Sequence, residues 1–100
     1  MEKRTRTYDL DALKIAFANT KQLRITASGL QGARAMGFSR QDIIDAIQSL
    51  QRSDFVKSMT TYHDHRVWQD VYNVSFGGYL VYIKFQVDEI GHFVISFKGK

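Results

Sequence analysis

The strand-rich second half of the chain contains side chains that could act on a phosphodiester bond: Lys57, Gln69, Tyr82, Lys84 and Lys98. Cleavage of RNA without a metal ion needs a base for the 2′-hydroxyl proton, a cation that stabilises charge on the phosphorus oxygens, and an acid for the leaving 5′-oxygen. Lysine supplies positive charge, tyrosine supplies a phenolic proton, and glutamine can hold a phosphate or a base edge. These residue types suffice for that chemistry only if the fold brings them to one surface.

Alternating apolar and polar residues in the second half of the chain predict antiparallel strands. Gly77-Gly78 indicates a two-residue hairpin, because both glycines accept the positive φ of a type I′ turn. Glu89-Ile90-Gly91 indicates a three-residue hairpin with glycine in the left-handed third position. We predict four strands, near residues 54–62, 67–76, 79–88 and 92–98.

The two hairpins determine which side chains share a face of the sheet. The first sets Asn73 opposite Tyr82, and the second sets Lys98 opposite Tyr82. One face then carries a group of polar side chains: Gln69, Asn73, Tyr82, Lys84 and Lys98. The other face is apolar and is expected to be the core, with Trp68 on it and Asp70 as its one misfit. A solvated outer face is the commonest reason for such a polar pattern, so the pattern alone does not indicate a site.

The place of Lys57 depends on the register of the hairpin that precedes these two. A two-residue turn would set Lys57 opposite Tyr72, on the core side. A three-residue loop or a bulge would move it beside Val71 or Asn73, on the polar side. Because a long charged side chain is rarely buried, we favour the second arrangement, in which Lys57 joins the polar face.

The first half of the chain predicts three helices. The first two begin after Asp9 or Asp11 and after Thr26 or Ser28, whose side chains can cap a helix. The third is capped by Ser39 and carries an apolar stripe formed by Ile43, Ile44, Ile47 and Leu50. The expected fold is α+β, a single domain over residues 1–100 in which an antiparallel sheet packs against N-terminal helices.

Composition excludes several classes of protein. With 44% hydrophobic and 24% charged residues, the chain is typical of a folded globule. It has no cysteine, and His63 and His65 in a predicted turn lack a third ligand nearby, so we expect no metal and no cofactor. No apolar run approaches the roughly 20 residues that span a bilayer. The N-terminus also lacks an apolar signal region, which makes the cytoplasm the expected location.

Basic residues are in excess: fourteen Lys and Arg against ten Asp and Glu give a net charge of +4. Such a balance favours encounter with phosphate polyanions. Lys3, Arg4 and Arg6 form a basic N-terminal arm, which is either an ordinary solubilising terminus or a phosphate contact that adds sequence-independent affinity.

Two sequence motifs resemble one protein family closely. SDF-x-KSMTTY covers residues 53–62 and WQDVY covers residues 68–72, with weaker matches in MEKRT at the start and VISFK near the end. The chain resembles the MqsR toxins, the motility quorum-sensing regulator group of RNA-cutting toxins. The resemblance implies a RelE-like fold and a metal-independent endoribonuclease that cuts single-stranded messenger RNA at GCU or related sequences. It also implies the toxin role in a type II toxin–antitoxin pair, with an MqsA-like antitoxin as partner.

The resemblance also implies roles for single residues. The lysine of SDF-x-KSM matches Lys57, the glutamine of WQDVY matches Gln69, and the tyrosine of the VY-x-K strand matches Tyr82, and these three are the expected catalytic residues. The family motif gives no role to Lys84 or Lys98, but both lie on the same face, and together with Asn73 they are expected to bind RNA. Two alternatives remain open: a non-catalytic nucleic-acid-binding or regulatory module, and an interaction protein whose sheet edge is completed by a partner strand.

Overall fold

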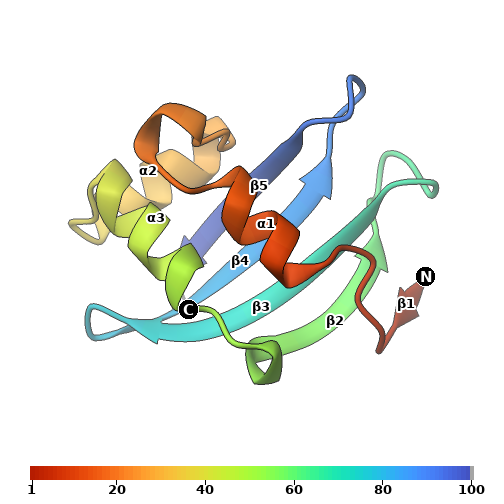
Figure 1. Ribbon diagram of the computed structural model, residues 1–100, viewed down its shortest axis with the longest axis horizontal. Helices are drawn as coiled ribbons and strands as arrows, with labels where there is room; N and C mark the ends of the chain where they lie inside the picture. Colours follow the sequence, from red (N-terminus) through yellow and green to blue (C-terminus); the bar gives the residue numbers. More distant parts are fainter. Residues whose placement is uncertain (100) are drawn as a thin grey trace.

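Residues 1–99, which the structure describes, form a five-stranded antiparallel sheet with three α-helices packed against it in this computed structural model (Figure 1). The strands lie side by side in chain order, and the helices come between the first strand and the second. This arrangement confirms the predicted α+β class. The elements are β1 (Glu2–Lys3), α1 (Leu10–Ala16), α2 (Ala27–Ala35), α3 (Arg40–Ser49), β2 (Phe55–Thr60), β3 (Trp68–Phe76), β4 (Tyr79–Val87) and β5 (Phe93–Gly99), with short 3₁₀ turns at Thr20–Gln22 and Arg52–Asp54.

Side-chain caps set the starts of the helices. Of the predicted alternatives, Asp9 caps α1 by accepting from the Ala12 amide at 3.0 Å, and Thr26 caps α2. The predicted cap of α3 is confirmed, because the Ser39 hydroxyl accepts from the Asp42 amide at 3.1 Å and the Asp42 carboxylate accepts from the Ser39 amide at 2.8 Å. Reciprocal bonds of this kind satisfy amides that a helix start would otherwise leave unpaired.

Both predicted hairpin registers are confirmed. In the first, Asn73 pairs with Tyr82 across β3 and β4, and the turn glycines Gly77 and Gly78 have φ of 58° and 83°. In the second, Lys98 pairs with Tyr82 across β4 and β5. Glycine at such turns fixes the register locally, since other residues rarely adopt positive φ.

A β-bulge places Lys57 on the polar face of the sheet. Phe55 pairs with Tyr72, but Lys57 pairs with Val71, so Val56 is an extra residue in β2 between these pairs. One inserted residue changes the parity of the strand and carries the next side chain to the opposite face. The structure therefore confirms the predicted arrangement, in which Lys57 lies on the polar face because burying a lysine is costly.

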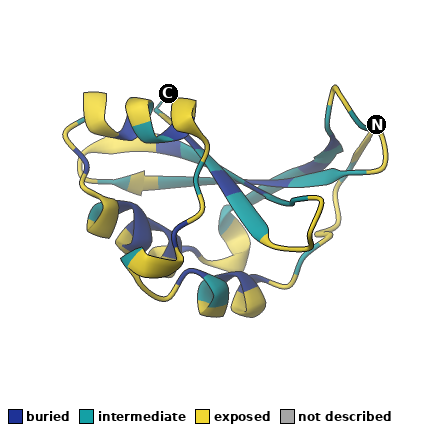
Figure 2. Cartoon of the chain, turned by 90° about the horizontal axis from the view of Figure 1, so that it is seen from above, coloured by how far each residue is buried: buried dark blue, intermediate teal, exposed yellow. Residues whose placement is uncertain are grey.

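The core lies between the helices and the sheet, where buried residues of both face one another (Figure 2). Trp68 does not belong to it, and the prediction that it does is wrong: the residue is partly exposed and lies outside the buried cluster. It is the first residue of β3, and the N-terminal segment contacts it there. Lys3 Nζ sits 4.2 Å from the centre of its ring, and the Tyr8 hydroxyl donates to the Trp68 carbonyl at 2.8 Å.

Asp70 anchors the N-terminal segment, which explains why a carboxylate interrupts the apolar face of β3. It is fully buried, and it accepts from the Thr7 amide at 3.0 and 3.1 Å and from the Tyr8 amide at 2.9 Å. The segment before Thr7 then forms β1, which pairs with β2 and was not predicted from the sequence. The N-terminus is thereby held along the edge of the sheet.

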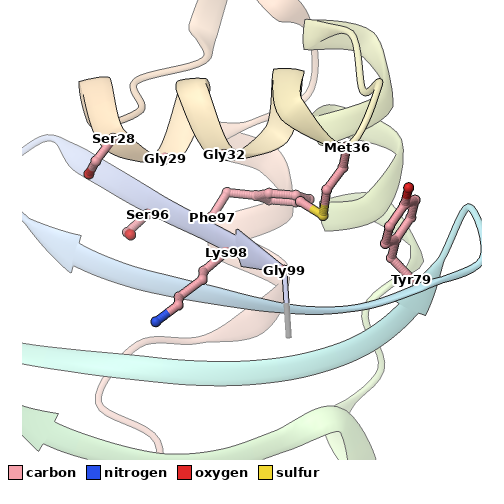
Figure 3. A pocket seen from close by; sticks show the side chains of 9 residues that line it. All are labelled: Ser28, Gly29, Gly32, Met36, Tyr79, Ser96, Phe97, Lys98 and Gly99. Carbon is pink, nitrogen blue, oxygen red and sulfur yellow. The ribbon is translucent and has the colours of Figure 1, made fainter.

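The opposite edge of the sheet is covered by α2. A Cβ atom on Gly29 would lie 2.9 Å from the backbone nitrogen of Phe97, so only glycine allows the helix this close to β5. Figure 3 shows the consequence for side chains of β5: Phe97 points beneath α2 towards Met36, whereas Lys98 extends away from the helix. The alternation that buries Phe97 therefore presents Lys98 on the polar face.

Candidate functional site

A shallow cavity of about 700 Å³ lies on the polar face of the sheet. It contains four of the six residues predicted to act on RNA: Lys57, Tyr82, Lys84 and Lys98. The remaining lining residues are Val56, Met59, Val71 and Gly99. The cavity therefore has three cations and one phenolic hydroxyl over a small apolar floor.

Strand pairing sets the order of these groups. Lys57 and Lys84 are the partners of Val71 on its two sides, so one row across the sheet reads lysine, valine, lysine. Tyr82 lies two residues before Lys84 on β4 and pairs with Lys98 on β5. Side chains at such pairs lie close enough to contact one substrate group together. Val71 is only 4% exposed because it lies between the two lysines, although it is on the polar face.

Gln69 lies on the predicted face but lines a different cavity. Its Nε2 donates to Gln86 Oε1 at 2.6 Å, and the cavity there, of about 850 Å³, also contains His63 and Arg66. The structure therefore separates Gln69 from the lysines and Tyr82 along the face. This second cavity carries acidic groups as well, from Asp64, Asp88 and Glu89.

Asn73 pairs with Tyr82 but lines neither cavity. Its Oδ1 is buried and has no hydrogen-bond partner among residues 1–99. An unpaired buried acceptor is costly, so a donor from a bound molecule would be favoured there.

Glu2 is a residue of the site that the sequence did not indicate. Its Oε1 lies 2.7 Å from Lys57 Nζ, and the contact is both a hydrogen bond and an ion pair. The pKa of Glu2 is lowered, first by the hydrogen bond from Lys57 and then by its charge. Only the pairing of β1 with β2 brings Glu2 to this position, so no local pattern could have found it. Between Met1 and Gly99, neither Lys84 nor Lys98 has an ion-pair partner.

His63, Asp64 and His65 occupy the turn between β2 and β3 without forming a metal site. The carboxylate of Asp64 binds the Arg66 guanidinium at 3.1 Å, and this hydrogen bond is the largest cause of the lowered pKa of Asp64. Over the described part of the chain, no group of three His, Cys, Asp or Glu residues could hold a metal ion. Nor is any helix within residues 1–99 long and apolar enough to cross a membrane.

Comparison with known proteins assigns the chain to a family. The family model described as "Motility quorum-sensing regulator, toxin of MqsA" matches residues 5–99. A curated protein from Escherichia coli (strain K12), named "mRNA interferase toxin MqsR", is 41% identical over 100 residues, which span the whole of both chains. Matches of this extent show common descent over the helices as well as over the motifs in β2 and β3. The chain belongs to the MqsR toxin family.

Proposed function

We propose that this protein is a metal-independent endoribonuclease that cuts single-stranded messenger RNA at GCU or related sites, as the toxin of a type II toxin–antitoxin pair. The observation that carries the proposal is the cavity in which Lys57, Tyr82, Lys84 and Lys98 converge. Membership of the MqsR family and the printed name of the E. coli relative support messenger RNA as the substrate.

The proposed reaction is attack of a ribose 2′-hydroxyl on the neighbouring phosphorus. The new O–P bond forms as the bond to the 5′-oxygen breaks, which leaves a 2′,3′-cyclic phosphate and a 5′-hydroxyl. Tyr82 donates the proton that the leaving oxygen takes up, while a base receives the proton of the 2′-hydroxyl. Lysine ammonium groups stabilise the negative charge that develops on the phosphorus oxygens.

The Glu2 contact supports a cationic role for Lys57. The Glu2 carboxylate lies 2.7 Å from the Lys57 ammonium group, which is the contact of a cation with its counter-ion. Lys57 is therefore assigned to charge stabilisation, together with Lys84. Gln69, which lies in the neighbouring cavity, is assigned to holding the substrate beside the cut.

The proposed partner is an MqsA-like antitoxin protein, because the family model describes its members as toxins of MqsA. An antitoxin of this kind would keep the nuclease inactive in the cytoplasm until it is released. Co-purification of the two proteins, with loss of cleavage when the antitoxin is added back, tests this part of the proposal.

Cleavage of a labelled RNA that contains GCU, in excess EDTA, tests the activity. Discrete fragments should appear, and DNA of the same sequence should resist because it lacks the 2′-hydroxyl nucleophile. Lys57→Ala protein from the same preparation controls for a contaminating nuclease. Activity that requires an added divalent metal would refute the mechanism, and binding without cutting would favour a non-catalytic nucleic-acid-binding module.

A further inference from the structure

A groove of about 450 Å³ lies where the N-terminal segment passes the 3₁₀ turn Arg52–Asp54. Three arginines are among the residues that line it: Arg4, Arg6 and Arg52. The backbone of this segment is fixed, because the amides of Thr7 and Tyr8 donate to buried Asp70. Arg4 and Arg6 therefore belong to an ordered segment of the chain rather than to a free tail.

Acidic residues also lie at the groove. Asp9 lines it, but its carboxylate caps α1. Asp11 is 4.0 Å from Arg52, with the two side chains 74% and 71% exposed, and an exposed pair of that length contributes little. The residues that line the groove therefore include three arginines and one aspartate, so a phosphate that enters it meets more positive than negative side chains, although Asp54 and buried Asp70 lie close by.

Tyr72 shows where the Arg6 side chain lies relative to the core. Its ring packs edge-to-face on Phe55, which lines the groove, and its buried hydroxyl has no hydrogen-bond partner within residues 1–99. Burial and then the charge of Asp70 raise the pKa of Tyr72, and the nearby Arg6 guanidinium opposes that rise. The Arg6 side chain therefore lies close to Tyr72, which packs behind the groove.

The groove is continuous with the candidate site. A third cavity, of about 410 Å³, is lined by Glu2, Lys3, Arg4, Val56 and Lys57. It shares Arg4 with the groove, and it shares Val56 and Lys57 with the cavity that holds Tyr82. Basic side chains therefore follow an unbroken line around the edge of β2, from Lys98 to Arg52.

We propose that the Arg4–Arg6–Arg52 groove is a phosphate-binding subsite that holds the RNA backbone beyond the nucleotides being cut. The proposal rests on the proposed function, since it needs an RNA strand at Lys57. A flexible single strand can follow the line around the β2 edge, and guanidinium groups match phosphate oxygens two at a time. The subsite contacts phosphates and not bases. It therefore adds affinity for any RNA that is long enough to reach it, whatever the sequence.

Binding of RNA of two lengths tests the subsite. The protein carries Lys57→Ala so that the RNA stays whole, and fluorescence anisotropy measures affinity across a salt series. The short RNA has about four nucleotides and the long RNA about sixteen, which bracket common site sizes on single-strand binding domains. The Arg4→Ala/Arg6→Ala variant is compared with Arg24→Ala/Arg34→Ala, which removes the same charge from residues that line none of the three cavities.

The groove variant should lose affinity for the long RNA only, and the slope of log affinity against log salt should fall by about 0.7 for each lost phosphate contact. Arg52→Ala should act in the same direction, and thermal melts confirm that each variant is folded. An equal loss on the short RNA, or in the control variant, would refute the subsite.

Two further outcomes separate this proposal from others. If the Lys57→Ala protein with all its arginines intact binds neither RNA, the result refutes the proposed function, on which the subsite rests. If the groove variant binds both RNAs normally but loses affinity for a polyglutamate peptide, the groove serves an acidic protein partner and the RNA subsite is refuted.

Discussion

Lys57 Nζ and Glu2 Oε1 are 2.7 Å apart, although the two residues are separated by 55 positions in the chain. The contact joins the short edge strand β1 to the lysine that the bulge of β2 carries onto the polar face. The position of the proposed catalytic lysine therefore depends on the first residues of the chain. An N-terminal fusion that displaces β1 would disturb this contact.

Glu2→Gln should remove the ion pair with Lys57 and so change how the stability of the fold varies with pH. The pKa of Glu2 is lowered in the folded protein, so the pair stabilises the fold above the ordinary carboxyl value of 4.5 and is lost as the pH falls through the folded value. The variant should melt slightly lower than the parent at pH 7, and the two should converge well below pH 4. A difference that persists at low pH would contradict the ion pair as its cause.

Lys57→Ala and Tyr82→Ala should each slow cleavage by ~10²–10⁴-fold, the usual contribution of one positioned acid–base or charged group. Both side chains line the cavity on the polar face, so circular dichroism and melting should stay close to the parent. Gln69→Ala should cost less, because Gln69 lies in the neighbouring cavity. Unfolding of the Tyr82→Ala protein would instead assign Tyr82 to the scaffold.

Lys84→Ala and Lys98→Ala should weaken RNA binding across all sequences, because both side chains line the cavity and neither has an ion-pair partner within residues 1–99. Each change should flatten the slope of log affinity against log salt by about 0.7. Anisotropy in the Lys57→Ala background measures this without cleavage, and fragment patterns of the single variants should keep the parental cut sites. If affinity and salt slope are both unchanged, the RNA does not cross this face.

Asp70→Ala should destabilise the protein by about 2 kcal/mol, because hydrogen bonds to a charged group contribute about 1.5–3 kcal/mol and the amides of Thr7 and Tyr8 lose their acceptor. Urea or thermal unfolding measures the loss. Asp45→Ala is the matched control, since Asp45 is exposed on α3 and accepts one side-chain bond, from Gln41. Equal stability of the two variants would show that Asp70 does not anchor the N-terminal segment.

Gly29→Ala should destabilise the packing of α2 on β5, whereas Gly32→Ala should be tolerated. The new Cβ would lie 2.9 Å from Phe97 N in the first case and 3.5 Å from Phe97 O in the second. Alanine is also a better helix former than glycine by about 1 kcal/mol, so Gly32→Ala can even raise the melting temperature. A destabilised Gly32→Ala protein would mean that the helix is packed more tightly than this geometry shows.

The sequence by itself determined the three helices, four of the five strands and most of the polar face. Turn glycines such as Gly77 and Gly78 fix a hairpin locally, and the period-two pattern then decides which side chains face the core. Strand ends were predicted to within two residues, and the pairing of Tyr82 with both Asn73 and Lys98 followed from the turns alone.

Only the tertiary structure decided which members of the face form one site. Gln69 lies in another cavity from Lys57, Trp68 lies outside the core beneath Lys3, and Glu2 reaches Lys57. These outcomes depend on a bulge and on an edge strand held by residues about sixty positions away, such as Asp70 for Thr7. The local pattern of apolar and polar residues cannot predict such contacts, because residues far apart in the chain meet and stabilise one another only in the folded protein.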